Sequence, residues 1–546
     1  MESVTVKPAT PPSRPELPTP PSSGEISPTR TPPVERANIG QERESSPEPP
    51  YSTLSETSKI SVILTASFAA IISPISSSIY FPALNSLAQD LHVSISLITL
   101  TVTTYLIFQG IAPSFIGNFS DTYGRRPAYI ICFAIYIAAN IGLALQDSYV
   151  ALMVLRCLQS SGSSGTIALG SAVVADVSTR AERGRYIGYA SMGVTLGPAL
   201  GPIVGGLLDQ YLGWRSIFWF LVIFAGVFFV VTLIAMPETC RAVVGNGSGA
   251  VPTWQLSLVQ FLRQRGKRKQ GPEAIDVQFA KRGPRRPNPF ASVKIAADKE
   301  AGIILWYGSL LYAGYFAVLS TWSPQLKARY NFDSLKIGLC YLPLGLGSLT
   351  SRWTVGRLLD MNFHRLARQH NMPIIKNKQQ DIREFPVEAA RLQVSIPLIY
   401  GACACIVAYS WVLSFKTNLA GPLVMLFFLG HLVSGAFSSL NTLVVDINKE
   451  SPATAVAANN LFRCLMGAGA SAVANPLIGR IGIGWTGTVI ACLWLVFSPS
   501  LWAVMEYGLK WRGEADAKRL KQKEKEEEEK RQANPEAGST AQRSTP

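Results

Sequence analysis

The sequence predicts an all-α polytopic membrane protein with twelve transmembrane helices in two pseudo-symmetric six-helix halves. Three observations carry this prediction. Hydrophobic residues make up 48% of the chain and charged residues only 16%, below the roughly 25% of a soluble domain. The apolar residues crowd into two long regions on either side of a polar central stretch, and each membrane span needs ~20 of them. Short motifs recur in both regions.

Twelve apolar segments have the length of a membrane span. The first six lie near 60–80, 97–118, 127–147, 149–175, 187–207 and 215–236, and the second six near 301–322, 335–357, 393–413, 420–445, 454–478 and 486–508. We expect helices, because a segment exposed to lipid must satisfy its own backbone hydrogen bonds. A β-barrel strand would alternate apolar and polar residues over ~10 positions, and residues 304–312 do not.

Polar segments divide the chain into five parts. We expect a disordered cytosolic N-terminal tail at 1–58, an N-terminal half at 59–236, a cytosolic central loop at 237–299, a C-terminal half at 300–508 and a charged cytosolic tail at 509–546. The loops after spans two, four and eight hold eleven Lys or Arg, whereas the loops on the other side hold six. Short basic loops stay in the cytosol, so both termini are expected there. The plasma membrane is the expected location, ahead of the vacuolar membrane.

The two halves repeat glycine and aspartate residues at corresponding positions. These are Gly117 and Asp121 at the end of span two, Gly356 and Asp360 at the end of span eight, Asp176 after span four, and Asp446 after span ten. Two six-span halves related by an axis along the membrane normal are typical of secondary transporters. The repeat argues against a single-bundle receptor.

The turn between spans two and three carries the strongest motif, Gly-Asn-Phe-Ser-Asp-Thr-Tyr-Gly-Arg-Arg-Pro. Gly124 permits a tight turn between antiparallel helices. Asp121 beside Arg125 and Arg126 can form a charge latch whose opening lets the halves rock, and Glu238 after span six is expected to join it. A plain turn with positive-inside charge is the alternative. The motif resembles the loop signature of the major facilitator superfamily.

Span five carries a stripe of small residues. Its members are Gly193, Gly197, Gly201 and Gly205 at a period of four, with Pro198, Pro202 and Gly206 among them. Such a stripe lets another helix approach closely, and the prolines weaken the helical hydrogen bonds. Plain helix packing explains this pattern as well as a transport role does. The segment Gly-Pro-Ile-Val-Gly-Gly resembles the antiporter motif of drug:proton exporters, which favours export.

A few polar residues lie inside apolar spans. A lone arginine in hydrocarbon is costly, so Arg156 in span four and Arg463 in span eleven should face the bundle interior or water. The candidates for proton or substrate contacts are Arg156, Gln159, His431, Asn459, Asn460 and Arg463, with Trp306 and Tyr312 as aromatic residues of the cavity. The alternatives are that Arg156 snorkels to an interface and that His431 only packs. Span one has no carboxylate, so the proton-carrying residue stays open.

Other classes of protein are disfavoured. The net charge of +15 lies largely in loops, where membrane orientation explains it, so nucleic-acid binding is not predicted. The eight cysteines form no CxxC pair, and no acid pair or Ser/His set within the spans indicates an enzyme. No metal or cofactor is expected beyond the proton gradient. The expected partners are a small-molecule substrate and the lipid bilayer, and the protein is expected to be a monomer.

Residues 58–508 resemble the twelve-span drug:H+ antiporter family, most of all the fungal multidrug exporters of the quinidine-resistance type. Fungal organic-acid exporters share the pattern. The resemblance implies export of a drug, secondary metabolite or organic acid by proton antiport, through alternating access to a midplane cavity. Aromatic residues in that cavity suit flat amphiphiles or cations, whereas the two arginines suit an anion. A proton-coupled importer of a small nutrient is the alternative.

Overall fold

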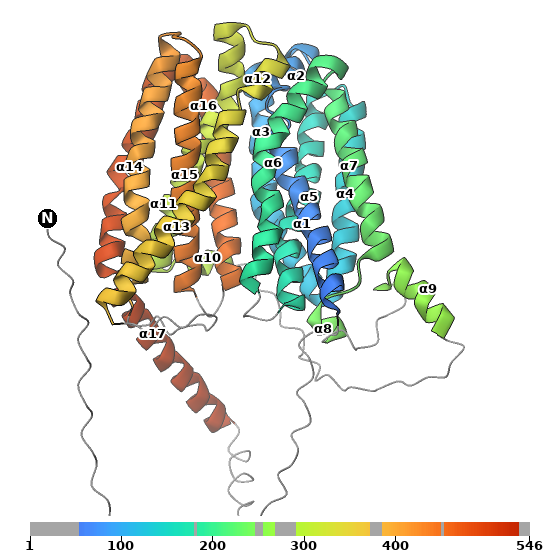
Figure 1. Ribbon diagram of the computed structural model, residues 1–546, viewed down its shortest axis with the longest axis vertical. Helices are drawn as coiled ribbons and strands as arrows, with labels where there is room; N and C mark the ends of the chain where they lie inside the picture. The colour runs from blue at the N-terminus through green and yellow to red at the C-terminus, as the bar shows by residue number, and fades with distance from the viewer. Residues whose placement is uncertain are drawn as a thin grey trace, which may run out of the picture. The chain divides into compact units, whose positions relative to one another are not determined.

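The computed structural model of this chain describes residues 54–178, 183–245, 255–267, 291–371, 385–448 and 452–533, and within these ranges the regular structure is helical. Helices α1 to α7 form the N-terminal half, and helices α11 to α17 form the C-terminal half (Figure 1). The predicted N-terminal tail lies outside the described residues, apart from its last positions.

The N-terminal half contains one short helix and six long ones. They are α1 (Glu56–Ser78), α2 (Leu84–Asp90), α3 (Ile95–Tyr123), α4 (Arg125–Leu145), α5 (Tyr149–Val177), α6 (Arg183–Leu212) and α7 (Arg215–Ala235). Helix α1 ends before Pro82, which has no N–H to continue the helix. Helix α3 begins where the Ser94 hydroxyl accepts the backbone N–H of Leu97 at 3.3 Å, an N-cap.

The C-terminal half repeats this order. Its helices are α11 (Lys299–Tyr330), α12 (Ser334–Leu339), α13 (Leu342–Gln369), α14 (Val387–Ser414), α15 (Ala420–Ile447), α16 (Pro452–Phe497) and α17 (Pro499–Ala533). Helix α16 holds two spans, because Gly482 interrupts it with a φ of 79°. Helix α17 continues the last span well into the predicted C-terminal tail, which is therefore partly helical.

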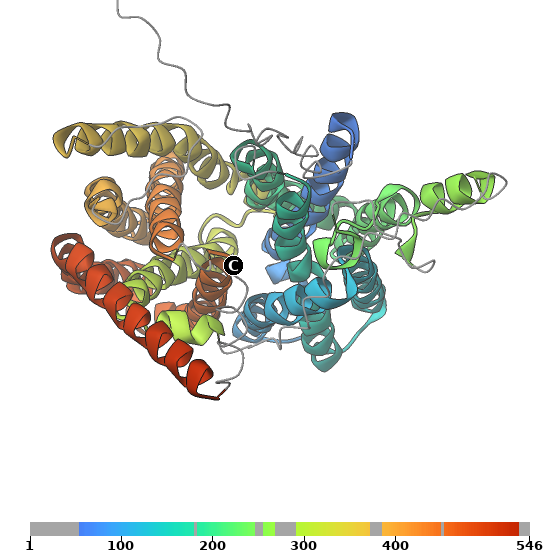
Figure 2. The ribbon, with the colours of Figure 1, turned by 90° about the horizontal axis from the view of Figure 1, so that it is seen from below.

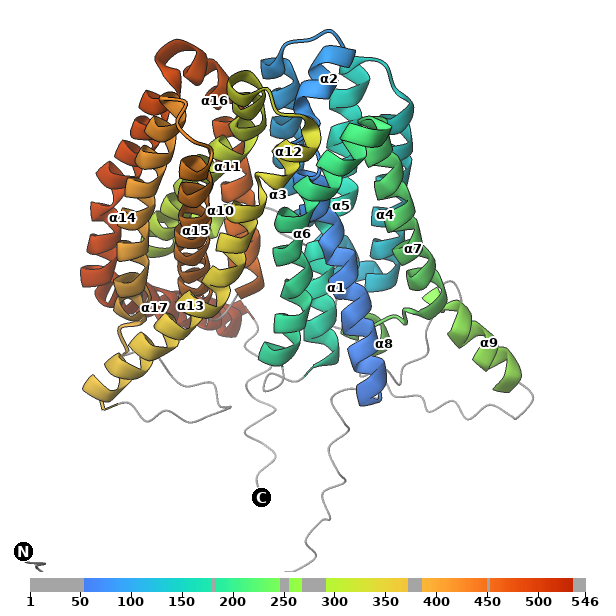
Figure 3. The same ribbon diagram turned by 45° about the horizontal axis from the view of Figure 1, so that its top comes forward.

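The region between the halves contains short helices rather than loop alone. They are α8 (Arg241–Val244), α9 (Leu258–Lys267) and α10 (Ala291–Ala296). Helix α9 lies next to α7 and projects from the bundle, as Figure 3 shows. Helix α10 packs against α11 and α16 of the C-terminal half.

The described residues account for twelve membrane spans. Eight segments are long and apolar enough to cross a membrane: α1, α3, α4, α7, α11, α14, α15 and Thr454–Ala515, the last of which holds two spans on either side of Gly482. Helices α5, α6 and α13, with 29, 30 and 28 residues, have the length and pack in the same bundle. Large apolar side chains such as Ile223 and Val496 are exposed on the outside, as a lipid-facing surface requires. The predicted fold class is confirmed.

The two halves pack alike. Helices α3 and α4 pack against α5, as α13 and α14 pack against α15, and α1 packs against α6 as α11 packs against α16. A short helix, α2 or α12, follows the first long helix of each half. The repeat seen in the motifs is therefore also a repeat of helix contacts.

We call the surface where the two halves meet the seam, and the contacts across it differ between its two ends. Helix α3 meets α16, and α6 meets α12 and α13. We call the end that holds the two short helices the α2–α12 end. The opposite end holds the turn between α3 and α4, and we call it the α3–α4 end; Figure 2 views the molecule from this side. Hydrogen bonds across the seam join Asn460 to Gln109, Asn475 to Thr99, Ser334 to Gln210, and Asn85 to Ser323.

These hydrogen bonds run from the middle of the seam to the α2–α12 end. Close packing follows the same course, since a Cβ added to Gly345 of α13 would lie 2.7 Å from Ala199 of α6. Toward the α3–α4 end, a Cβ on Gly117 or Gly356 would meet nothing within 4 Å. Among the described residues, the hydrogen bonds and close glycine contacts across the seam therefore lie between its middle and the α2–α12 end.

Candidate functional site

A charged cluster surrounds the turn between α3 and α4. The Arg125 Nε donates to Asp176 at 2.8 Å, and its Nη1 donates to Asp121. Glu238, which follows α7, accepts the backbone N–H of Arg125 at 2.8 Å. Gly124 has a φ of 111°, and a Cβ there would collide with the Glu238 carboxylate. Both the backbone angle and the lack of space therefore require glycine at this turn.

Burial separates the members of this cluster. The side chains of Arg125 and Asp176 are only 9% and 10% exposed, whereas that of Asp121 is 67% exposed. The Arg126 side chain donates to the Leu233 carbonyl at 2.9 Å, and its ion pair with Asp121, expected as part of the latch, is not formed. The buried pair of Arg125 and Asp176 is therefore the firm part of the predicted latch.

The C-terminal half has a related pair at the same end. Arg391 in the first turns of α14 lies 3.1 Å from Asp446 at the end of α15, as Arg125 lies beside Asp176. Asp360 is exposed and makes no ion pair with the described residues. The sequence prediction included Asp360 and Asp446 but missed Arg391. An alignment of the two halves would have found it, because Arg391 precedes span nine as Arg125 precedes span three.

Arg156 lies in the interior of the N-terminal half. It is 1% exposed, and its Nη1 donates to Gln159 Oε1 at 2.5 Å. The guanidinium carbon lies 4.1 Å from the ring centre of Tyr80 and 4.4 Å from that of Tyr105. Its Nε and Nη2 have no hydrogen-bond partner among the described residues. Gln159 in turn donates to Asn140 at 2.6 Å. Arg156 therefore does not snorkel to an interface.

Arg463 lies at the seam on α16. Its Nε and Nη2 donate to Asn460 Oδ1 at 3.3 and 2.9 Å, and the ring centre of Tyr312 lies 5.2 Å from its guanidinium carbon. Asn460 donates to the backbone carbonyl of Gln109 in the other half at 3.0 Å. Arg463 forms no ion pair within the described part of the chain. The structure thus brings together three predicted residues, Arg463, Asn460 and Tyr312.

A chain of contacts joins the two arginines across the seam. Gln109 donates from its side chain to Ser73 Oγ at 3.4 Å, and the Tyr105 hydroxyl donates to the Ser73 carbonyl at 3.2 Å. Tyr105 contacts Arg156, and Gln109 accepts from Asn460 beside Arg463. Among the described residues neither arginine has a carboxylate partner, and the two share one polar layer in the middle of the bundle, which we call the arginine layer.

His431 lies apart from this layer. Its Nδ1 is 3.0 Å from the Thr350 hydroxyl and its Nε2 is 3.2 Å from the Thr354 hydroxyl, both on α13. Both ring nitrogens therefore have partners, as in a histidine that joins two helices.

Two further candidates also lie outside the arginine layer. Asn459 donates to Asn441 Oδ1 at 2.6 Å, a contact within the C-terminal half. Trp306 is 55% exposed and packs against Phe462, with the ring centres 6.4 Å apart. The role predicted for these two residues gains no support from their contacts.

The span-five glycines lie where α6 packs against α1. A Cβ on Gly197 would lie 2.7 Å from Pro74, and Cβ atoms on Gly201 and Gly205 would collide with the next turn of α1. A Cβ on Gly206 would collide with the backbone of α12 across the seam. The same helix contains the other members of the motif, Gly193, Pro198 and Pro202. Close helix packing accounts for these contacts, and the antiporter role stays a prediction.

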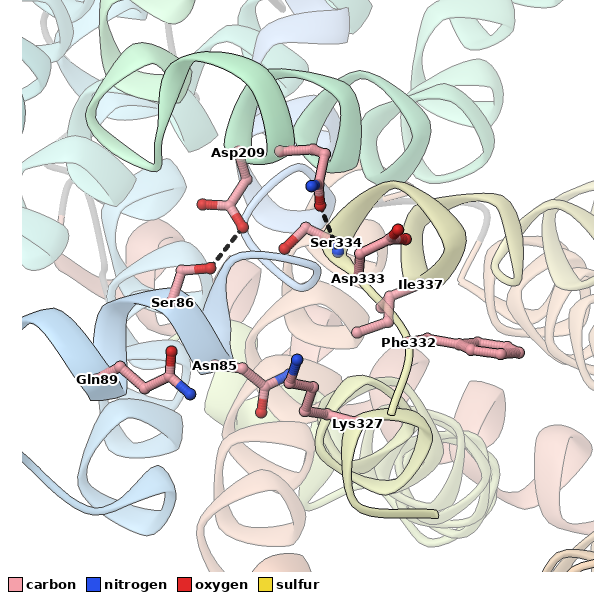
Figure 4. Close-up of a pocket in the computed structure, with 10 residues that line it drawn as sticks. Asn85, Ser86, Gln89, Asp209, Lys327, Phe332, Asp333, Ser334 and Ile337 are labelled. Carbon is pink, nitrogen blue, oxygen red and sulfur yellow. Dashed lines mark hydrogen bonds between the residues drawn. The ribbon is translucent and has the colours of Figure 1, made fainter. Parts of the chain in front are cut away.

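A cavity of about 290 Å³ lies at the α2–α12 end. Figure 4 shows Asn85, Ser86 and Asp209 of the N-terminal half facing Lys327 and Ser334 of the C-terminal half. Asp209 is 7% exposed and accepts the Ser86 hydroxyl at 2.6 Å. No motif marks Asp209, so the sequence did not predict it. This cavity lies at the end of the seam where hydrogen bonds join the halves.

Comparison with known proteins settles the family. Residues 66–472 match the sequence profile of the Major Facilitator Superfamily. The chain belongs to this superfamily. It is 48% identical to MFS-type transporter R5 of a Phoma species, over 86% of this chain and 88% of the relative. It is 36% identical to Citrate exporter 1 of Aspergillus niger, over 88% of this chain and 92% of the relative.

A solved structure shares the fold. The human organic anion transporter MFSD10 has a TM-score of 0.51 and 16% identity, covering 81% of this chain and 99% of that one. The chain is therefore a multi-pass membrane transporter of the major facilitator superfamily, and not an enzyme.

Proposed function

We propose that this transporter exports a small organic anion from the cytosol by proton antiport, through alternating access between its two halves. The observation that carries the proposal is the arginine layer. Arg156 and Arg463 lie within the bundle, and neither forms an ion pair with a carboxylate of the described residues. An uncompensated charge in a membrane interior is costly, so a bound anion would supply the missing partner.

The surroundings of the two arginines suit a carboxylate. A guanidinium group donates two parallel hydrogen bonds to a carboxylate, and Arg156 keeps two nitrogens without a hydrogen-bond partner among the described residues. Tyrosine rings lie beside both guanidinium groups, so a ligand would bind through nitrogens at the edges that Gln159 and Asn460 do not occupy. The name of the Aspergillus niger relative, Citrate exporter 1, supports an organic acid as the substrate.

The proposed direction rests on orientation. We place the α3–α4 end and both termini in the cytosol, because the basic short loops lie at that end. Among the described residues, the hydrogen bonds across the seam lie away from that end, which suits loading from the cytosol. The span-five motif also favours export. We place the protein in the plasma membrane, where an inside-negative potential adds about 2.3 kcal/mol per unit charge per 100 mV to the exit of an anion.

Reconstitution tests this function. Proteoliposomes loaded with labelled citrate at neutral pH are diluted into acidic buffer, and release is followed with and without a protonophore. We expect the inward pH gradient to accelerate release and the protonophore to abolish that acceleration. Arg463→Gln should lose transport, and protein-free liposomes provide the baseline.

Three outcomes would contradict the proposal. Release that ignores the protonophore would contradict antiport. Accumulation of external citrate with protons would support the importer instead. Failure to move citrate or any other carboxylate of a labelled panel would contradict an organic-anion substrate.

A further inference from the structure

A third cation lies within the spans, in the middle of α13. Arg352 is exposed, and it forms no hydrogen bond or ion pair with the described residues. An arginine within a span must face water, a ligand or a protein partner, because hydrocarbon does not solvate its charge. The direction in which the Arg352 side chain points therefore indicates which of these surroundings it has.

The contacts of neighbouring residues define the face of α13 that holds Arg352. Gly345 packs against Ala199 of the N-terminal half, Ser348 accepts a hydrogen bond from α15, and Trp353 is 72% exposed. At about 100° per residue, Arg352 points within about 20° of Gly345 and about 40° of Ser348, but about 100° from Trp353. Arg352 therefore faces the seam between the halves and not the lipid.

The depth of Arg352 matches that of Arg463. Ser348 lies beside Tyr315 of α11, and Arg352 lies about 6 Å farther toward the α3–α4 end at 1.5 Å per residue. Tyr312, which contacts Arg463, lies about 4.5 Å from Tyr315 in the same direction. Along the helix axes, Arg352 on α13 and Arg463 on α16 thus lie at nearly the same level.

We propose that Arg352 and Arg463 form a two-cation subsite for a di- or tricarboxylate. This inference rests on the proposed function. Arg352 would extend the arginine layer to a third helix, α13. Each guanidinium group would bind a separate carboxylate of one substrate, and Arg352 would select substrates by their number of carboxylates. Because Arg352 lies on the α3–α4 side of the contact between Gly345 and Ala199, it would meet a substrate that arrives from the cytosol.

Transport kinetics test this subsite. KM and kcat for labelled citrate and labelled benzoate are measured in proteoliposomes with wild-type protein, Arg352→Gln and Arg352→Lys. A lost charged hydrogen bond corresponds to about a tenfold or larger loss of affinity. We expect Arg352→Gln to raise the KM for citrate about tenfold and the KM for benzoate less than about twofold. Arg352→Lys should give an intermediate KM for citrate, since lysine keeps the charge but lacks the two parallel N–H donors of a guanidinium group.

Arg357→Gln is the matched control. Arg357 is also exposed and lies five residues farther along α13, at about 140° from Arg352 around the helix. Its loss should leave both KM values unchanged, and thermal unfolding in detergent reports whether each variant folds. Equal effects of Arg352→Gln on citrate and benzoate, or no effect on either, would overturn the subsite. If the wild-type protein moves no carboxylate, the proposed function itself fails, which is a different result.

Discussion

The two halves of this transporter pack alike but hold their charges differently at the α3–α4 end. In the N-terminal half, Arg125 contacts both Asp121 and Asp176. In the C-terminal half, Arg391 contacts Asp446, and Asp360 makes no ion pair with the described residues. A shared position in the repeat therefore does not bring a shared partner.

The length of one connection explains the difference. A single residue, Gly124, separates α3 from α4, which places Asp121 and Arg125 four residues apart on adjoining helix ends. Seventeen residues separate α13 from α14, so no single-residue turn places Asp360 beside Arg391. Among the described residues, a tight turn therefore joins this acidic residue to an arginine only in the N-terminal half.

The largest expected effect is on transport, in the pair Asp121→Asn and Asp360→Asn. Asp121→Asn should lower the transport rate at least about tenfold, about 1.4 kcal/mol in the barrier, because it removes an acidic member of the charge latch that we propose opens and closes as the halves rock. Asp360→Asn should transport normally. The unfolding temperatures of both should stay near wild type, because Asp121 is 67% exposed and an exposed pair contributes about 0–1 kcal/mol. Full transport by Asp121→Asn would disprove the latch.

The next effect is on stability, in the pair Asp176→Asn and Asp446→Asn. Asp176 and its partner are 10% and 9% exposed, whereas Asp446 and Arg391 are 25% and 16% exposed. Breaking the more buried pair leaves Arg125 without its main partner, so Asp176→Asn should cost about 3 kcal/mol. Asp446→Asn should cost about 1 kcal/mol. Thermal unfolding of the purified proteins in one detergent measures the difference, and equal losses would mean that burial does not separate the halves.

The effect of a glycine-to-alanine substitution on stability should differ in sign between the halves. Gly124→Ala introduces a Cβ at a φ of 111° and against the Glu238 carboxylate, so it should destabilise by more than about 1 kcal/mol. Gly356→Ala lies in a helix with nothing within 4 Å of the new Cβ, so it should stabilise by about 0.5–1 kcal/mol. The two unfolding temperatures check this. A loss of transport by the stabilised Gly356→Ala would indicate that the α3–α4 end closes on this residue during the cycle.

The spans could be predicted from the sequence because lipid imposes length and apolarity on each one separately. Contacts between helices obey no such local rule. Arg463, Asn460 and Tyr312 were predicted from their polarity or aromatic character, and they do meet. Arg352 was missed, because the sequence alone does not say which way a charge near the end of a predicted span points. Asp209 was missed because its burial depends on α2 and α12, which belong to different halves.

The smallest expected effect concerns pH at the α2–α12 end, where Asp90 of the N-terminal half and Asp333 of the C-terminal half lie outside the spans. The Trp214 indole N–H, and then Arg215, hold the pKa of Asp90 below its ordinary value. The backbone N–H of Lys336 does the same for Asp333, which caps α12. A lowered pKa gives stability that is present above the ordinary value, near 4, and is lost as pH falls through the lowered one. Asp90→Ala and Asp333→Ala should therefore lower the unfolding temperature by the same small amount from neutral pH down to about pH 5, and by less below about pH 4. Because each carboxylate also has a charged partner, Arg215 for Asp90 and Lys336 for Asp333, added salt should shrink both effects. If the difference in unfolding temperature between a variant and wild type changes between pH 5 and 7, a group other than Asp90 or Asp333 titrates there.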